Sequence, residues 1–386
     1  MKRVLQIAVL IAGAVATASM AHAEIKVGFV TSLSGPGASI GIPYGRGIQA
    51  AVQYADSVGD QKIKLIQLDD GSDPSAATRN ARKLVEEDKV DLLIGTSSVP
   101  ATMAMMAVAT ELKVPMIAIS PINVPASEGD RWGIAVPQPP SLMVSVVIDR
   151  MKRDGVKNVA YIGFSDAWGD LVYNGAKKAA DAGEINLLTN ERYARTDTSV
   201  TGQVLKIVAT HPDAVLIGGS GTQGALPLLG LAERGYKGRL DGTPALLNPD
   251  FVRIGGKAAE GILVSAGPVI VAEQLPDTHF SKKISMIFRE AHQKANGVVP
   301  TDGFSAYSFD AWLIFLDAAK RARSQTSQAQ PGTPEFRTAL RDAIFTTKEL
   351  VGTHAIYNFK PGASYGVDAR GLVIVRLVGG KWTYEP

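Results

Sequence analysis

Hydroxyl side chains cluster in IGTSSVPATMA, residues 94–104, between an apolar run and a segment with helical periodicity. A catalytic serine, a phosphate cradle and the rim of a small pocket could each be built from such a stretch. Ser97, Ser98 and Thr102 stand where a predicted strand ends and a predicted helix begins, so backbone N–H groups and hydroxyls can converge there on anionic oxygens. Ser98 could also merely cap the helix that starts near Pro100, and capping is compatible with binding.

A nucleophilic serine needs partners that the sequence does not supply in evident company. The motif GFSDA resembles a nucleophile elbow around Ser165, except that Ala167 stands where a glycine is required. The histidines beyond the first 23 residues show no paired-ligand spacing; they are His211, His279, His292 and His354. We therefore expect no catalytic residue and no metal site, and an exported hydrolase that uses Ser165 or Ser98 is a weak alternative.

The first 23 residues, MKRVLQIAVLIAGAVATASMAHA, have the basic start, apolar run and small-residue end of a secretory signal peptide, with cleavage expected after Ala23. No later apolar run has membrane-spanning length, so we expect no direct membrane insertion. The chain contains no cysteine, which removes disulfides, thiolate metal sites and a lipid anchor on an N-terminal cysteine. These features predict a soluble protein in a Gram-negative periplasm.

The mature chain is nearly neutral. The signal peptide carries two of the 40 basic residues, Lys2 and Arg3, and none of the 37 acidic ones. Such a balance gives no reason to expect nucleic acid or an anionic membrane as a partner. The remaining length is sufficient for two domains with full cores.

A glycine pattern offers another chemistry. Gly219, Gly221 and Gly224 in GGSGTQG match G-x-G-x-x-G, follow a predicted strand, and precede Asp241 by the distance typical of a dinucleotide site. The pattern lies in the second half of an exported chain, where nicotinamide and flavin nucleotides are scarce. We therefore favour a tight turn that lines a cleft, with Ser220 as a candidate ligand contact, and expect no cofactor.

The elements that must position these residues alternate along the chain. Short β-branched runs predict strands at residues 25–33, 62–70, 90–95 and 114–120. Helical periodicity predicts helices near 44–58, 74–88 and 101–112. Asp73 before Pro74 fits a helix cap followed by a first-turn proline. A β-α-β-α series implies a parallel sheet with right-handed crossovers.

The pattern starts again after the Pro-rich segment AVPQPPS, residues 135–141. Predicted helices follow near 141–154, 173–182, 200–210 and 223–234, and predicted strands at 158–164, 186–189 and 213–219. A helical segment near 303–323, an exposed loop at 324–334 and a strand pair around 355–383 complete the chain. The sequence therefore predicts two similar α/β halves.

Five segments together carry a resemblance to a known family: VGFVTSLSGPGASIG (27–41), LDDGSDPSAATRNARKLVEEDKVDLLIG (68–95), VPMIAISP (114–121), IGFSDAWGD (162–170) and NPDFVRIGGKAAEG (248–261). In order and spacing they resemble the periplasmic solute-binding proteins of ABC importers related to the leucine/isoleucine/valine-binding protein. The resemblance implies an α/β fold of the type I periplasmic binding protein: two Rossmann-like lobes with parallel sheets, joined by a three-strand hinge.

The resemblance also implies a division of the chain. Lobe one is expected at residues 24–141 and 268–325, and lobe two at 142–267 and 326–360. Residues 361–386 are expected to form a C-terminal strand segment.

The family binds a ligand carboxylate at the helix start and the next strand end of the first lobe. The matching residues here are Ser97, Ser98, Ala101, Thr102, Pro121, Ile122 and Asn123. The aromatic side chain that covers the ligand from the second lobe is matched by Trp168. A tryptophan in a strand-to-helix loop is more naturally a pocket wall than a core residue.

Two departures from the family argue against an amino-acid ligand. Amino-acid binders place an acidic residue against the ligand ammonium, and Pro244 stands at the matched position. A tyrosine that lines their first lobe is replaced by Ile40. A buried ammonium without a carboxylate partner costs on the order of several kcal/mol, so an α-amino acid is disfavoured.

Two further segments, 194–206 and 267–277, resemble a branch of the family that includes binders of aromatic acids. In that branch a basic residue at the position of Arg195 and a polar ring at the position of Tyr307 meet ligand substituents. Arg195 could hold an anion with two hydrogen bonds, or pair on the surface with Asp197 or Glu191. Tyr307 could equally pack within a helix layer with its hydroxyl in solvent.

The sequence therefore predicts a monomeric periplasmic protein that closes two lobes on a small carboxylate without an amine, preferably an aromatic acid, and delivers it to an ABC permease in the inner membrane. One alternative is a binder of branched-chain amino acids whose ammonium meets backbone carbonyls, Asp197 or Asp166. Another is the sensory subunit of a membrane receptor.

Overall fold

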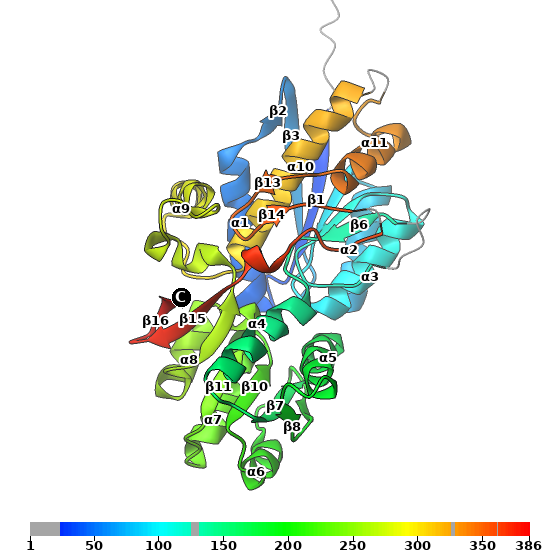
Figure 1. Ribbon diagram of the computed structural model, residues 1–386. Coiled ribbons are helices and arrows are strands. Elements are labelled where there is room, and N and C mark those ends of the chain that lie inside the picture. Colours follow the sequence, from blue (N-terminus) through cyan, green and yellow to red (C-terminus); the bar gives the residue numbers. More distant parts are fainter. Residues whose placement is uncertain (1–23, 125–130, 326–328, 361) are drawn as a thin grey trace, which may run out of the picture.

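The computed structural model describes residues 24–124, 131–325, 329–360 and 362–386, which form two α/β lobes (Figure 1). The expected signal peptide, residues 1–23, lies outside the described residues. Within those described ranges, no helix is long and apolar enough to cross a membrane.

The first lobe is built on a sheet in the order β2-β3-β1-β4-β5-β6. Its strands are β1 (Ile25–Thr31), β2 (Ser57–Val58), β3 (Gln61–Asp69), β4 (Leu92–Gly95), β5 (Met116–Ala118) and β6 (Gly133–Ala135). All neighbouring strands are parallel except β2 and β3. Because β1 and β4 are almost entirely buried, their sequences are nearly continuous apolar runs, as expected for a covered parallel sheet.

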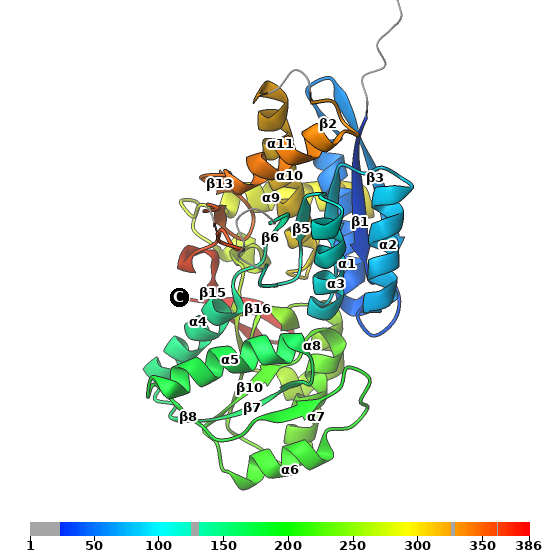
Figure 2. The same ribbon diagram turned by 90° about the vertical axis from the view of Figure 1, so that its right-hand side faces the viewer.

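Helices cover both faces of this sheet (Figure 2). They are α1 (Ala38–Tyr54), α2 (Pro74–Glu86), α3 (Val99–Glu111), α9 (Lys282–Asn296), α10 (Ser305–Gln325) and α11 (Pro334–Phe345). The Asp73 side chain caps α2 by accepting from the Ala76 N–H at 2.7 Å, as predicted. Helix α1 begins earlier than predicted, because packing against α9 and α10 keeps Pro43 inside the helix rather than at its first turn.

The second lobe contains a sheet in the order β16-β15-β12-β11-β10-β7-β8, with β9 also paired to β7. Its strands are β7 (Asn158–Phe164), β8 (Asn186–Leu187), β9 (Glu191–Tyr193), β10 (Ala214–Gly218), β11 (Arg239–Gly242), β12 (Leu263–Ala266), β15 (Val373–Val378) and β16 (Lys381–Glu385). Its helices are α4 (Pro140–Arg153), α5 (Ala167–Asp181), α6 (Thr201–Ala209), α7 (Leu226–Glu233) and α8 (Pro249–Ala259). The hairpin β15–β16 pairs antiparallel to β12.

The chain passes between the lobes in three places: between β6 and α4, between β12 and α9, and between the hairpin β13 (Leu350–Val351) and β14 (Ile356–Tyr357) and strand β15. Two of these crossings are tied to the first lobe by side chains. The Tyr307 hydroxyl donates to Gln138 Oε1 at 2.6 Å, and Gln138 Nε2 donates to the Gly371 carbonyl at 2.7 Å. The lobes are therefore joined by a hinge of three segments.

The packing corrects one expected boundary. Residues 326–360 were expected in the second lobe, but α11 packs against α10. Phe336 and Leu340 of α11 belong to the same buried apolar cluster as Trp312 of α10. The last crossing therefore comes after this segment, and only the C-terminal hairpin joins the second lobe.

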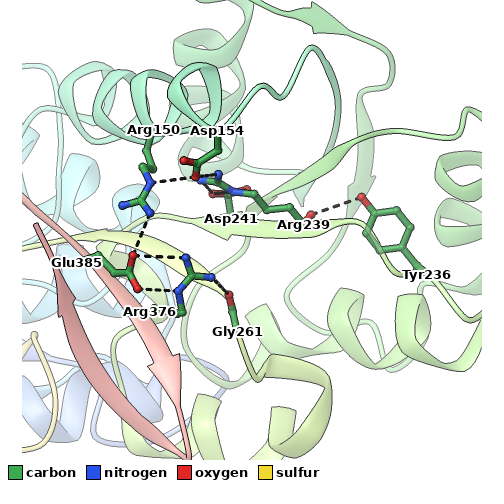
Figure 3. Close-up of polar contacts among 8 residues, drawn as sticks. All are labelled: Arg150, Asp154, Tyr236, Arg239, Asp241, Gly261, Arg376 and Glu385. Atoms are coloured by element: carbon green, nitrogen blue, oxygen red, sulfur yellow. Dashed lines mark hydrogen bonds and ion pairs between the residues drawn. The ribbon is translucent and has the colours of Figure 1, made fainter.

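A chain of ion pairs attaches that hairpin to the second lobe (Figure 3). Glu385 accepts from Arg376 Nε at 2.8 Å and from Arg150 Nη2 of α4 at 2.9 Å. Beside it, Arg239 binds Asp241 with Nη2 at 2.6 Å from Oδ1, and burial raises the pKa of Asp241 to about 6. The C-terminal residues are thus held to α4, the first helix after the first crossing.

Candidate functional site

A pocket lies between the two lobes, with about 430 Å³ of empty space that includes open solvent. It is lined by Ile40, Tyr44, Ser97, Ser98, Val99, Ser120, Pro121, Pro137, Met143, Trp168, Arg195, Ser220, Pro244, Ala245, Phe304 and Tyr307. The contributions come from strand ends, helix starts and the hinge. This is the place where ligands of open α/β sheets bind.

The first-lobe wall is held by buried hydrogen bonds. Ser97 Oγ accepts from the Ser32 N–H at 2.8 Å and shares a 2.8 Å hydrogen bond with Thr31 Oγ1. Thr31 gives its own proton to the Gly41 carbonyl, so the Ser97 proton points to Thr31 and not to a ligand. Ser97 therefore holds the wall in position and does not donate a hydrogen bond to a ligand.

Below this wall lies the buried carboxylate of Asp70. It accepts from the Ser32 hydroxyl at 2.6 Å, from the Ser72 N–H at 2.9 Å and from the Thr96 hydroxyl. Thr96 directly precedes Ser97, and the Ser32 N–H donates to Ser97 Oγ. By holding the Thr96 and Ser32 side chains, Asp70 fixes the loop that leads into α3.

The donors that this wall offers a ligand lie at the start of α3. Ser98 Oγ accepts from the Ala101 N–H at 3.4 Å, which leaves the Ser98 proton available. Ser98 and Val99 line the pocket at the N-terminal end of the helix, where the helix dipole favours a negative charge. The Ser120 hydroxyl is committed to the Thr96 carbonyl at 2.7 Å. Ser98 and the helix start are thus the anion-binding corner.

Four expected contacts do not line the pocket. Ala101 is fully buried behind the helix start, and Thr102 exchanges hydrogen bonds with the backbone of Thr96. Ile122 packs into the apolar core, and Asn123 is exposed. Of the strand-end residues expected to help, Pro121 lines the pocket.

Aromatic rings form one side of the pocket. Tyr44 and Phe304 contact edge to face with centroids 5.6 Å apart, and the Tyr44 hydroxyl donates to the Ile119 carbonyl at 2.7 Å. Tyr307 stacks on His354 at 3.8 Å, and desolvation raises the pKa of Tyr307 well above its usual value. The Tyr307 hydroxyl is buried against Gln138, so the alternative that it reaches solvent is wrong.

Arg195 supplies the cation of the second-lobe wall. Its Nε lies 2.6 Å from Asp166 Oδ2, its Nη1 donates to Ser220 Oγ at 3.1 Å, and its guanidinium lies 4.2 Å from the centre of the Phe164 ring. Its partner is thus Asp166 and not Asp197 or Glu191, the two acids considered from the sequence. These contacts fix the guanidinium at the pocket.

Trp168 stands beside Arg195 at the start of α5. Its indole N–H donates to the Gly219 carbonyl at 3.3 Å, and its side chain is 4% exposed while lining the pocket. Because the only polar atom of the ring is used by the protein, Trp168 presents an apolar face to a ligand.

Among the lining residues that the structure describes there is no aspartate or glutamate. Pro244 and Ala245 occupy the second-lobe wall where amino-acid binders are expected to carry their acid, and Ile40 lines the opposite wall. Asp166 lies behind Arg195 and is paired with it. The lining is therefore mostly apolar and aromatic, with its polar side chains supplied by serines, tyrosines and Arg195.

Sequence reasoning missed several lining residues. Tyr44 and Phe304 meet across a separation along the chain that no local pattern reveals, and Pro137 and Met143 belong to the first hinge crossing and the helix after it. Ser120 had a usable signal, because it stands at the end of β5 directly before Pro121.

Among the described contacts, no histidine bonds to Ser98 or Ser165, the two serines considered as nucleophiles. His279 bonds to Ser281, His292 to the Val298 carbonyl and His354 to the Gly303 carbonyl. In the described residues no group of three histidine, aspartate or glutamate side chains is placed to hold a metal ion.

Comparisons with known proteins show the family and the fold. The family described as "Periplasmic binding protein" matches residues 24–360. The Leu/Ile/Val-binding protein homolog 2 of Brucella abortus (strain 2308) is 24% identical over 357 residues, which cover 90% of this chain and 93% of that protein. An extracellular ligand-binding receptor from Rhodopseudomonas palustris HaA2 is 40% identical, with a TM-score of 0.88 over 94% of this chain and 100% of that chain.

A second structural neighbour shows the fold alone. It is an ABC-transporter solute-binding protein from R. palustris in complex with benzoate, with a TM-score of 0.73 and 23% identity over 94% of this chain and 95% of that chain. The two-lobed architecture is the type I periplasmic binding fold. The chain therefore belongs to the periplasmic-binding-protein family and is related to the binding proteins for branched-chain amino acids.

Proposed function

We propose that this chain is the periplasmic substrate-binding component of an ABC importer that captures a small carboxylate without an amine, preferably an aromatic acid. The exported monomer closes its lobes on the ligand and presents the closed form to a permease in the inner membrane. It performs no chemistry on the ligand. Two features of the pocket support this, its donors and its lack of acids.

The main support for the proposal is the set of protein groups that the carboxylate or the ammonium of a ligand would contact in the pocket. A carboxylate meets the Ser98 hydroxyl and the start of α3, where positive potential is built in. An ammonium meets Pro244 and Ala245, which offer no charged acceptor. Burying an ammonium without a carboxylate costs on the order of several kcal/mol, so the pocket selects against α-amino acids.

The remaining walls suit a flat ring. Tyr44, Phe304, Tyr307 and Trp168 line the same pocket as Ser98 and Arg195. The remaining N–H groups of Arg195 and the Ser220 proton can meet a hydroxyl or second carboxylate on the ring. The benzoate-bound neighbour from R. palustris, although related only in fold, is a protein of this architecture that holds such a ligand.

A branched-chain amino acid is the second candidate, favoured by the name of the Brucella relatives. In that case the ammonium would meet backbone carbonyls, Asp197 or, if it left Arg195, Asp166. If Asp166 were used, its ion pair at 2.6 Å would be broken or shared on binding.

A thermal-shift screen tests the proposal. Residues 24–386, refolded to strip any bound ligand, are heated with benzoate, hydroxybenzoates, cinnamates, leucine, valine and short dicarboxylates. A ligand at about one hundred times its dissociation constant adds roughly 2.7 kcal/mol of stability, a rise of several degrees. We expect aromatic acids to shift the melting temperature and leucine not to. A shift with leucine alone would overturn the proposal.

A further inference from the structure

The glycine pattern that resembles a nucleotide motif has a packing explanation. Residues 219–220 join β10 to the short helix η1 (Gly221–Ala225), and the glycine pattern continues into that helix. A Cβ on Gly219 would clash with the Tyr193 hydroxyl oxygen, and one on Gly224 would clash with Leu246 Cδ2. Both glycines are therefore required by close packing within the second lobe.

Gly221 differs from these two because its neighbours belong to the other lobe. Its φ is +57°, and a Cβ there would lie 2.6 Å from Ser39 Oγ and 3.2 Å from Ile40 Cγ1 in α1. The next residue, Thr222, donates its backbone N–H to Ser39 Oγ at 3.2 Å. This loop and the start of α1 thus form a contact between the lobes.

The same loop is bonded to the side chains that face the ligand. The Gly219 carbonyl accepts from Trp168, and Ser220 Oγ accepts from Arg195. On the other side of the contact, Ile40 follows Ser39 and lines the pocket. A ligand that holds Trp168 and Arg195 in place therefore also holds the loop in the position that meets Ser39.

We propose that Ser39 and residues 219–222 form a latch that stabilises the closed, ligand-bound form, with Gly221 as the position where an added side chain would disturb this contact between the lobes. The latch deepens the proposed function and rests on it. With a side chain at residue 221, either Ser39 turns away and loses its hydrogen bond to Thr222, or the lobes stop short of closing. Both outcomes lower the closed population and, with it, the apparent affinity.

The chain offers a matched control for Gly221→Ala. Gly183, also in the second lobe, has φ +74°, and a Cβ added there would have nothing within 4 Å, so Gly183→Ala brings the same left-handed strain without an inter-lobe contact. A second variant, Ser39→Ala, removes the oxygen nearest to the new methyl group. Combined with Gly221→Ala it should restore part of the closure that the single variant loses.

Closure can be read directly, because the chain contains no cysteine. Met103 on α3 and Leu205 on α6 are each 50% exposed, so Met103→Cys and Leu205→Cys carry one spin label on each lobe. Pulsed electron–electron double resonance then gives the distribution of distances between the two labels, with and without benzoate. Calorimetry gives the benzoate dissociation constant.

We expect benzoate to move the wild-type chain and Gly183→Ala to the closed distance. Gly221→Ala should close less, with a dissociation constant raised about fivefold or more, the lower end of what overpacking costs. Closure of Gly221→Ala equal to that of Gly183→Ala would overturn the latch.

Failure of the proposed function has a different signature, since benzoate would then leave even the wild-type distance unchanged. In that event the latch is tested without a ligand, in concentrated sucrose, which favours the form with less exposed surface. A closed fraction lower in Gly221→Ala than in Gly183→Ala supports the latch, and equal fractions overturn it.

Discussion

The two walls of the pocket hold their ligand-facing groups in different ways. In the first lobe, short side chains are fixed by buried hydrogen bonds to one another, to the backbone and to Asp70, and few donors are left for a ligand. In the second lobe, Trp168 and Arg195 are long side chains, each anchored at one or two atoms with the rest of the group facing the pocket. The first wall is therefore suited to one constant group, the carboxylate, and the second wall to the part of the ligand that varies.

The largest effect should come from removing the support of the first wall. Asp70→Ala takes the acceptor from the buried Ser32 and Thr96 hydroxyls, and two hydrogen bonds to a charged group amount to about 3 to 6 kcal/mol of unfolding free energy. Asp73→Ala in the same loop removes an exposed helix cap and should cost about 1 kcal/mol. Urea titrations measure both. Equal losses would mean that the first wall is no better supported than an exposed loop.

His354, which stacks on Tyr307, should make the free energy of unfolding depend on pH. Burial lowers the pKa of His354 to about 3, from 6.5. Between pH 6.5 and about pH 3, His354 therefore binds a proton in the unfolded chain but not in the folded chain. The folded state loses free energy of unfolding as the pH falls below 6.5. In His354→Gln this loss is absent, so at pH 5 the wild type should have lost about 2 kcal/mol more than the variant, relative to pH 7. Parallel pH profiles of unfolding free energy would show that His354 titrates freely.

At the carboxylate corner, Ser98→Ala should weaken every carboxylate ligand by a similar amount. The lost hydrogen bond is to a charged group, so about 1.5 kcal/mol is expected. Isothermal titration with benzoate and with an aliphatic acid of similar length measures both losses. An unchanged dissociation constant would remove Ser98 from the site, and a loss confined to one ligand would contradict the division of labour between the walls.

The second-lobe wall should discriminate between planar and aliphatic ligands. Trp168→Ala is expected to weaken benzoate by about 1 kcal/mol more than the aliphatic acid, because only the planar ligand loses a ring contact. The same pair of titrations measures this difference. Equal losses for the two ligands would argue that Trp168 is a packing residue.

Local sequence patterns predicted individual strands and helix caps, whose residues interact mainly with their neighbours along the chain. Strand β7 has the predicted bounds, Asn158–Phe164, and Asp73 caps α2. Helix α1 begins before the predicted residue because packing in the tertiary structure outweighs the preference of Pro43 for a first turn. The amphipathic helix α9 was not predicted at all, although its sequence carries the pattern.

For the site, the sequence could indicate strand ends and helix starts but not which side chains face inward. Ser98 and Thr102 both lie at the start of α3, yet one lines the pocket and the other turns to Thr96. The ring pair Tyr44 and Phe304 depends on how distant helices pack. Such orientations are set by the whole fold, so spacing alone cannot give them.

We propose above all that the pocket accepts a carboxylate and rejects an α-ammonium. The most direct test is calorimetric titration of residues 24–386 with 3-phenylpropionate and phenylalanine, which differ only by that ammonium. We expect 3-phenylpropionate to bind at least about one hundred times more tightly than phenylalanine, since an unpaired buried ammonium costs on the order of several kcal/mol. Tighter binding of phenylalanine would contradict this and would mean that backbone carbonyls, Asp197 or Asp166 hold the ammonium of an amino acid.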